Sequence, residues 1–360
     1  MSDGVKNMDK EAQSNKNTVS LCAVAVLILI KYAMVARISA GNEYALRTVI
    51  AVTASVTAFT ALLFAYYKLS SGFSENCKYA AIMLLADPLI LSNFFGVWQT
   101  VSLVIALIFL ITLDRFRTKE SLVTGIALFT AAAVVFNPSG VTGYASLILC
   151  SGLIFGAFGE SEIIRNRKDV VTPVIICIVS AVLSAVAGGL VRKGFNYTSV
   201  YNYIPYERFD IQQIKSFFAF NRNFTELRTA VLACIPVSVA CVCFINLLKK
   251  EKANSKNKDF AFKRKLVCAS FCAVFISDVS GCLFFNSKAS ISLLVFSPVV
   301  PILIIKNGKN NAFKQTVTEL EKKIASYPVL FTLAVIYTAA FFIPFCASNN
   351  IYKYITDFLV

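Results

Sequence analysis

Residues 170–191, VVTPVIICIVSAVLSAVAGGLV, decide the fold class, because they form an apolar run without a single charged residue. Such a run is long enough for an α-helix to cross the roughly 30 Å of hydrocarbon in a bilayer. Charged residues return on both sides of it, in residues 159–169 and at Arg192 and Lys193. This arrangement predicts a helix that spans a membrane.

Other apolar runs of similar length occur along the whole chain. The predicted spans are residues 18–36, 48–67, 79–95, 97–113, 121–137, 139–158, 170–191, 229–248, 266–285, 288–305 and 328–346. Hydrophobic residues make up 57% of the chain and charged residues 15%, whereas soluble domains have about 45–50% and about 25%. The sequence therefore predicts an all-α, polytopic transmembrane bundle of about eleven spans.

The lysine and arginine residues fall mainly into alternate loops. The basic set comprises the N-terminus and residues 68–78, 114–120, 159–169, 249–265 and 306–327. Cytoplasmic loops carry the excess of basic residues in membrane proteins. We therefore expect a cytoplasmic tail at 1–17, a transmembrane domain at 18–346 and an outer C-terminal tail at 347–360.

Residues 249–265, KKEKANSKNKDFAFKRK, are the clearest cytoplasmic marker. We interpret them as a topology signal, with binding of lipid headgroups or a partner as the alternative. The net charge of +15 then reflects cytoplasmic loops rather than a nucleic-acid partner. On the other side, residues 192–228 form the one long predicted outer loop. Apolar residues at helical spacing within 210–220 predict an interfacial amphipathic helix there.

Two residue types limit the chemistry. The chain has no histidine, which excludes Ser-His, Cys-His and histidine-base mechanisms. Its 11 cysteines lie nearly all within apolar runs and lack zinc-site spacing, so no zinc site is predicted.

Two aspartates lie inside predicted spans, where a charge is costly and usually faces a bundle interior or a cavity. Asp87 directly precedes Pro88, and Asp278 lies in FISDVSGC. Both are candidate functional groups within the membrane. The alternatives are that Asp87 caps a proline-broken helix and that Asp278 makes an interhelical hydrogen bond.

Glu43 is the acidic residue of the first predicted outer loop, between Arg37 and Arg47. Two arginines beside a carboxylate at a membrane surface could hold a phosphate next to a general base. The alternative is an ordinary short loop with interfacial anchors. Arg192 and Arg222 also lie on the predicted outer side, where they would either bind a lipid phosphate or simply be solvated.

Residues 79–113, YAAIMLLADPLILSNFFGVWQTVSLVIALIFLITL, resemble the GT-C superfamily of membrane glycosyltransferases, notably the mannosyltransferases of the GPI-pathway type. The shared feature is a proline-broken helix, a short turn and a second apolar helix. Gln99 matches the glutamine of the family's Gly-Gln-x-Asp-like turn, and Val101 replaces its aspartate.

Three more segments resemble the family in position. Phe136-Asn137-Pro138 is similar to the end of its next helix, and residues 217–224 are similar to an Asn-rich outer motif. Residues 286–290 occupy the place of a His-Glu-Arg-Tyr-like motif but contain neither histidine nor glutamate.

The resemblance implies transfer of a sugar, such as mannose, from a polyprenyl-phosphate donor to a glycan or lipid acceptor on the extracytoplasmic face. Glu43 would be the catalytic base. The implied substrate-binding residues are Arg37, Arg47, Gln99, Arg192, Asn221 and Arg222. Some GT-C enzymes use a divalent metal, and the resemblance leaves that open. The membrane would be the plasma membrane in a bacterium or the endoplasmic reticulum in a eukaryote.

The sequence leaves other function classes open, so enzymatic activity is an expectation only. One class is a transporter, lipid flippase or polysaccharide polymerase; in a transporter or flippase, Asp87 and Asp278 would line a water path. Another is a catalytically silent GT-C relative that binds lipid-linked glycan or scaffolds a partner enzyme. The altered motifs favour this second class.

Overall fold

The computed structural model describes residues 97–194, 234–250, 258–285 and 297–327, together with positions 69, 72, 293–294, 329 and 333–334. Within this part 87% of the residues are helical and no residue lies in a strand. The predicted all-α class is therefore confirmed for the described residues.

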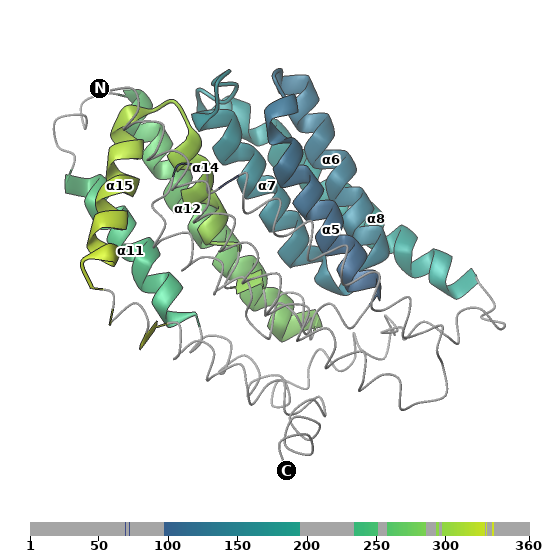
Figure 1. Ribbon diagram of the computed structural model, residues 1–360. Helices are drawn as coiled ribbons and strands as arrows, with labels where there is room; N and C mark the ends of the chain where they lie inside the picture. The colour runs from purple at the N-terminus through teal and green to yellow at the C-terminus, as the bar shows by residue number, and fades with distance from the viewer. Residues whose placement is uncertain are drawn as a thin grey trace, which may run out of the picture.

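The described elements are α-helices and two short 3-10 helices (Figure 1). They are α5 (Val97–Thr112), η2 (Leu113–Arg115), α6 (Lys119–Phe136), η3 (Pro138–Gly140), α7 (Val141–Phe158), α8 (Arg167–Gly194), α11 (Ile235–Lys250), α12 (Lys258–Phe285), α14 (Val299–Asn307) and α15 (Asn311–Ala325).

Among the helices that the structure describes, three are long and apolar enough to cross a membrane. They are Lys119–Phe136, Val141–Phe158 and the Arg167–Gly188 part of α8. They coincide with the predicted spans 121–137, 139–158 and 170–191 to within a few residues. This agrees with an integral membrane protein, and it confirms these segments as helices of spanning length.

Local capping explains where two of these helices begin and end. The Thr118 hydroxyl accepts a hydrogen bond from the Ser121 backbone N–H at 3.2 Å, which starts α6. Pro138 follows α6 after one residue and cannot supply the backbone N–H that would continue the helix. The Asn166 side chain accepts from the backbone N–H of Lys168 at 2.9 Å and so starts α8.

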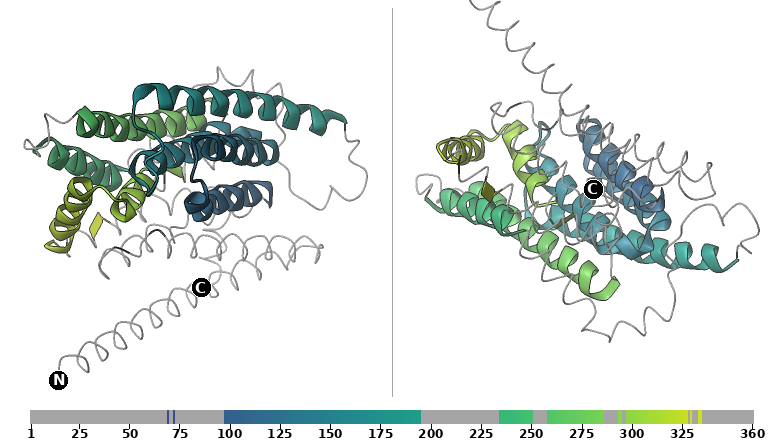
Figure 2. Two further views of the ribbon diagram at one scale, coloured as in Figure 1. Left: turned by 90° about the horizontal axis from the view of Figure 1, so that it is seen from above. Right: turned by 60° about the horizontal axis from the view of Figure 1, so that its bottom comes forward.

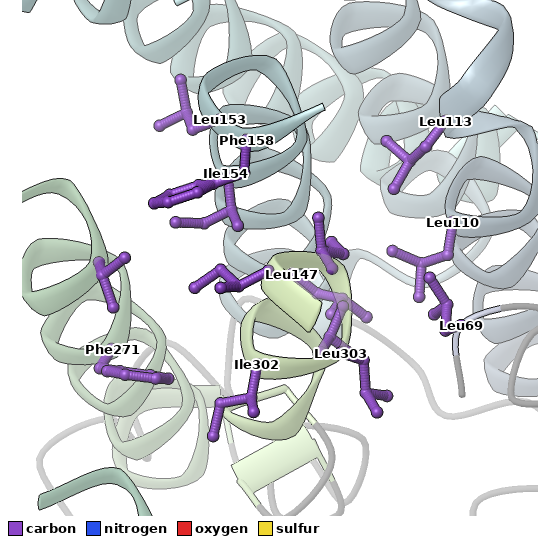
Figure 3. Packing of buried hydrophobic residues seen from close by; sticks show 14 of the residues in the cluster. Leu69, Leu110, Leu113, Leu147, Leu153, Ile154, Phe158, Phe271, Ile302 and Leu303 are labelled. Atoms are coloured by element: carbon purple, nitrogen blue, oxygen red, sulfur yellow. The ribbon is translucent and has the colours of Figure 1, made fainter. Parts of the chain in front are cut away.

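Helix α7 is the centre of the bundle. It packs against α5, α6, α8, α12 and α14, and 72% of its spanning window is buried, against 22% for α8. In Figure 3, Leu147 and Ile154 of α7 lie between Phe271 of α12 and Leu110 of α5. Figure 2 keeps α8 and α15 at opposite edges of the bundle in both views. The apolar core therefore forms around α7.

Glycines allow the neighbouring chain to approach α7 closely. A Cβ added at Gly152 would lie 2.8 Å from Ile126 Cδ1 of α6. A Cβ at Gly156 would lie 2.9 Å from Ile164 Cδ1, in the connection that follows α7. Both distances are shorter than a carbon–carbon contact tolerates, so a larger side chain at either position would have to displace its neighbour.

Large apolar side chains also cover the outside of the bundle. On α8 they recur at helical spacing and are 50–64% exposed: Val171, Ile175, Ile178, Val179, Val182, Leu183 and Val186. Leu128 of α6 and Ile276 of α12 are exposed to a similar extent. Apolar patches of this size are unusual on a soluble protein, whereas hydrocarbon would cover them in a bilayer.

Three elements differ from the sequence-based expectation. Helix α14 covers only the end of the predicted span 288–305, because a turn at Ser297 and Pro298 precedes it. Helix α12 begins at Lys258, inside the segment predicted as loop 249–265, and α15 lies inside predicted loop 306–327. In α15, Phe313, Val317 and Leu320 are buried at helical spacing, and Asn310 caps the helix by accepting from the Phe313 N–H. Charge counting treated both segments as loops and missed this amphipathic pattern.

The exposed face of α8 gives a direct test of lipid contact. The chain has one tryptophan, so Val182→Trp in a Trp98→Phe background reports from that face alone. We expect phospholipids brominated on the acyl chain to quench this tryptophan strongly, because Val182 would face hydrocarbon. Fluorescence in reconstituted bilayers is the measurement.

The matched control is Arg165→Trp in the same background, an exposed position in the α7–α8 connection. It should be quenched weakly by brominated acyl chains and strongly by aqueous iodide. The opposite pattern, with position 182 accessible to iodide and insensitive to the lipids, would show that α8 faces water.

Candidate functional site

The first polar centre of the described bundle is a buried lysine at the start of α12. Lys263 is 1% exposed, and its Nζ donates a hydrogen bond to Glu162 Oε1 at 2.9 Å. The same nitrogen lies 3.1 Å from Asp259 Oδ2, one helical turn earlier, and 5.8 Å from the centroid of the Phe158 ring. Two carboxylates and an aromatic face thus compensate the ammonium for its loss of water.

Aromatic rings extend this centre to α15. The rings of Phe158 and Phe313 meet edge to face with centroids 4.8 Å apart, and Phe260 lies at the same distance from Phe313. The Lys309 backbone N–H donates to the Phe158 carbonyl at 3.0 Å, and its Nζ donates to the Glu160 carbonyl at 3.2 Å. The end of α7 and the starts of α12 and α15 therefore meet at one point.

The backbone at Glu162 is shaped for this contact. Its φ of 40° lies in the left-handed region, which costs a non-glycine residue roughly 1–2 kcal/mol. The ion pair with Lys263 offsets part of this cost. The hydrogen bond from Lys263 is also the largest cause that lowers the pKa of Glu162, and the charges of Lys263, Arg165 and Lys309 lower it further.

A second ion pair joins α6 to α8. Lys119 Nζ lies 2.8 Å from Asp169 Oδ1, and Asp169 Oδ2 accepts from the backbone N–H groups of Arg165 and Asn166 at 3.2 Å. These hydrogen bonds, with that from Lys119 first, lower the pKa of Asp169. The carboxylate at the third position of α8 thus also caps the helix start.

A third, buried pair joins α14 to α15. Lys306 Nζ lies 2.9 Å from Glu321 Oε2 and 2.8 Å from Thr318 Oγ1. The neighbouring Asn307 side chain donates to the carbonyl of Leu69. Together, these contacts gather residues from the predicted inner segments 68–78, 114–120, 159–169, 249–265 and 306–327 at one end of the bundle. We call this the basic end.

The second polar centre is Asp278, deeper along α12. Its side chain is fully buried, and neither carboxylate oxygen has a hydrogen-bond partner. No ion pair is formed by it among the described residues. Among the described residues, its side chain therefore makes no interhelical hydrogen bond, which was the structural alternative for this residue. A buried polar group without a partner costs about 1–3 kcal/mol, and a charged one costs more.

Two further predicted site residues lie at helix ends opposite the basic end. Gln99 is in the first turn of α5 and Arg192 in the last turn of α8, and only their backbone positions are described. The remaining candidates fall outside the described residues: Glu43, Arg37, Arg47, Asp87, Asn221 and Arg222. The grouping of Glu43 with the arginines therefore stays a prediction.

The described residues contain no group of three or more Cys, Asp or Glu side chains that could hold a metal ion. Sequence reasoning did not single out Lys263, Glu162 or the Lys306–Glu321 pair. The i,i+4 spacing of Asp259 and Lys263 was the available signal for the first centre. The composition of residues 249–265 hides this signal, because it is that of a charged loop.

No protein-family model matches the chain, and no curated protein and no solved structure is significantly similar to it. A function for this chain is therefore inferred from its own residues alone.

The Lys263 centre predicts an asymmetric response to substitution. The double variant Glu162→Gln/Asp259→Asn leaves the buried ammonium without its carboxylates and should lower the free energy of unfolding by about 2–3 kcal/mol. This is below the usual cost of breaking a buried pair, because water screens the two half-exposed carboxylates. Lys263→Met should cost less, since the freed carboxylates can hydrate. Unfolding in detergent, followed by circular dichroism, measures both.

The pH dependence of the free energy of unfolding provides the control. Because folding lowers the pKa of Glu162, its contribution is fully present above the ordinary value of 4.5 and is lost as the pH falls through the folded pKa. The stability difference between wild type and Glu162→Gln should therefore narrow on acidification. Equal losses in Lys263→Met and the double variant would contradict this account.

Proposed function

We propose that the chain is a polytopic membrane protein of GT-C type, with about eleven spans and the basic end in the cytoplasm. On the opposite face it transfers a sugar from a polyprenyl-phosphate donor to a glycan or lipid acceptor. The observation that carries the proposal is the gathering of the predicted inner segments at one end of the bundle. Two ion pairs and a hydrogen bond join segments that are far apart in the sequence and that the charge alternation assigns to one side.

In this orientation, the end of the bundle that contains η3 faces the extracytoplasmic side, where the sugar transfer would take place. Because α5 and α8 each have one end at the basic end, the turns that carry Gln99 and Arg192 lie at the other end. The sequence assigns Glu43, Arg37 and Arg47 to the same side. An acceptor and a lipid-linked donor would therefore meet at the extracytoplasmic surface.

The reaction requires one base and a site for the leaving phosphate. Glu43 takes the proton from the acceptor hydroxyl, and the hydroxyl oxygen attacks the anomeric carbon of the sugar. The bond from that carbon to the phosphate oxygen breaks, and the polyprenyl phosphate leaves with the electron pair. Arg37, Arg47, Arg192 or Arg222 would stabilise this phosphate, because guanidinium groups bind phosphate oxygens in pairs. Gln99 and Asn221 would bind the sugar.

Transport is the second candidate function, and the burial of Asp278 without a hydrogen-bond partner favours it. A buried carboxylate without a partner on a membrane helix is typical of ion or proton pathways. In that case the chain would move a solute or a lipid-linked glycan without forming a new bond. The experiment below separates the two candidates.

Photo-crosslinking with a polyprenyl-phosphate sugar probe in membranes tests the donor site. We expect specific labelling of wild type, retained labelling of Glu43→Gln and at least a tenfold loss in Arg47→Ala, since the arginine binds the phosphate and the glutamate acts only in transfer. A turnover assay on Glu43→Gln should then show transfer reduced by about 10²–10⁴-fold.

Arg165→Ala is the matched control, because it removes an exposed arginine at the basic end. It should label like wild type. Absence of specific labelling in wild type, or full transfer by Glu43→Gln, would remove the glycosyltransferase proposal and leave transport to be tested by solute uptake.

A further inference from the structure

Among the described residues, the helices that pack against Asp278 offer no charge that could neutralise it. Helices α7 and α11 and the turn η3 pack against α12. Their titratable residues are Tyr144 and Cys150 on α7, and Cys241, Cys243, Lys249 and Lys250 on α11. Both lysines are at the C-terminus of α11, which precedes the start of α12 at the basic end. Within the described residues, the carboxylate therefore has no cation beside it.

The contacts between α7 and α12 show which groups lie level with Asp278. Glu162 pairs with Lys263, and Cys150 Sγ donates to the Ser270 carbonyl at 3.7 Å, so the two helices run antiparallel. Asp278 lies eight residues beyond Ser270, and Thr142 lies eight residues before Cys150. Both steps correspond to about 12 Å of helix rise, which places Thr142 and Asp278 at the same height.

Thr142 is also short of a partner. Its hydroxyl oxygen is buried and makes no hydrogen bond, like the two oxygens of Asp278. The carboxylate of Asp278 and the hydroxyl of Thr142, at one height of two packed helices, are thus both buried and unsatisfied. Such groups are rare in native structures and usually mark a site for water, an ion or a ligand.

The end of α6 adds carbonyl oxygens at this height. Pro138 lacks a backbone N–H, so the Val134 carbonyl cannot receive the regular helical hydrogen bond. The turn that contains Pro138 packs against α12 and directly precedes α7. The last carbonyls of a helix carry its partial negative charge, which attracts a cation.

We propose that Asp278, with the hydroxyl of Thr142 and the carbonyl end of α6, binds a monovalent alkali cation such as Na⁺ inside the bundle. One carboxylate neutralises one positive charge. A divalent ion would require more carboxylates than the described residues supply. All the proposed ligand atoms are oxygens, which suit hard cations. The site does not depend on the proposed sugar transfer, because none of its ligands is a residue that we assign to that reaction.

The experiment measures thermal unfolding of the full chain in detergent, in NaCl and in choline chloride at equal ionic strength. Wild type should unfold about 5 °C higher in saturating NaCl, because a ligand that binds only the folded state stabilises it. Asp278→Asn keeps the size of the side chain and removes its charge, so its midpoint should be the same in both salts. Thr142→Val should raise the half-saturating Na⁺ concentration about tenfold.

Ser280→Ala is the matched control, because its hydroxyl bonds to the Ile276 carbonyl of its own helix. It should respond to Na⁺ like wild type. Labelling with a hydrophobic carbodiimide, which modifies protonated carboxyl groups in apolar surroundings, gives a second measurement. Mass spectrometry should find Asp278 modified in choline chloride and protected in NaCl.

Two results would overturn the proposal. One is a midpoint of thermal unfolding that Li⁺, Na⁺ or K⁺ raises by the same amount in wild type and in Asp278→Asn, or a wild-type midpoint that none of these ions raises. The other is carbodiimide modification of Asp278 that no alkali cation reduces, which would assign the carboxyl group to protons alone.

Discussion

A lysine ammonium can be buried only where nearby negative groups compensate it for the loss of water. The contacts that do this for Lys263 determine how the basic end is arranged. Its partners come from its own helix, through Asp259, and from the α7–α8 connection, through Glu162. Because the Phe158 ring beneath it also contacts Phe313, the same centre fixes the position of α15. One buried charge thus joins three segments that are distant in the sequence.

The rest of the described bundle follows a different rule. Apolar side chains fill the core around α7 and also cover the outer face of α8, as a protein in contact with hydrocarbon requires. Charged groups are concentrated at the basic end, where they form ion pairs. Among the buried charged residues that the structure describes, Asp278 is the exception, because it lies away from the basic end and its carboxylate has no hydrogen-bond partner. Because the other buried charges are paired and Asp278 is not, a bound cation explains this carboxylate better than a structural role does.

Hydropathy alone predicted α6, α7 and α8 to within a few residues, because an uninterrupted apolar run of spanning length has few alternatives. It missed α15 and the start of α12, since amphipathic helices rich in lysine have the same composition as loops and differ only in periodicity. Asp278 was identified as a candidate from its position in an apolar run. The absence of a hydrogen-bond partner for Asp278 follows from how α7 and α12 pack, and a single sequence does not reveal that packing.

The central claim is that the basic segments meet at one end of the bundle. Lysine-specific crosslinking of the intact protein in its membrane, read by mass spectrometry, tests it most directly. The account predicts links between Lys119 and Lys168, and between Lys309 and Lys258, because ion pairs and hydrogen bonds place their segments together. Links from any of these lysines to Lys193, Lys215, Lys288 or Lys353, on the predicted outer side, would contradict it.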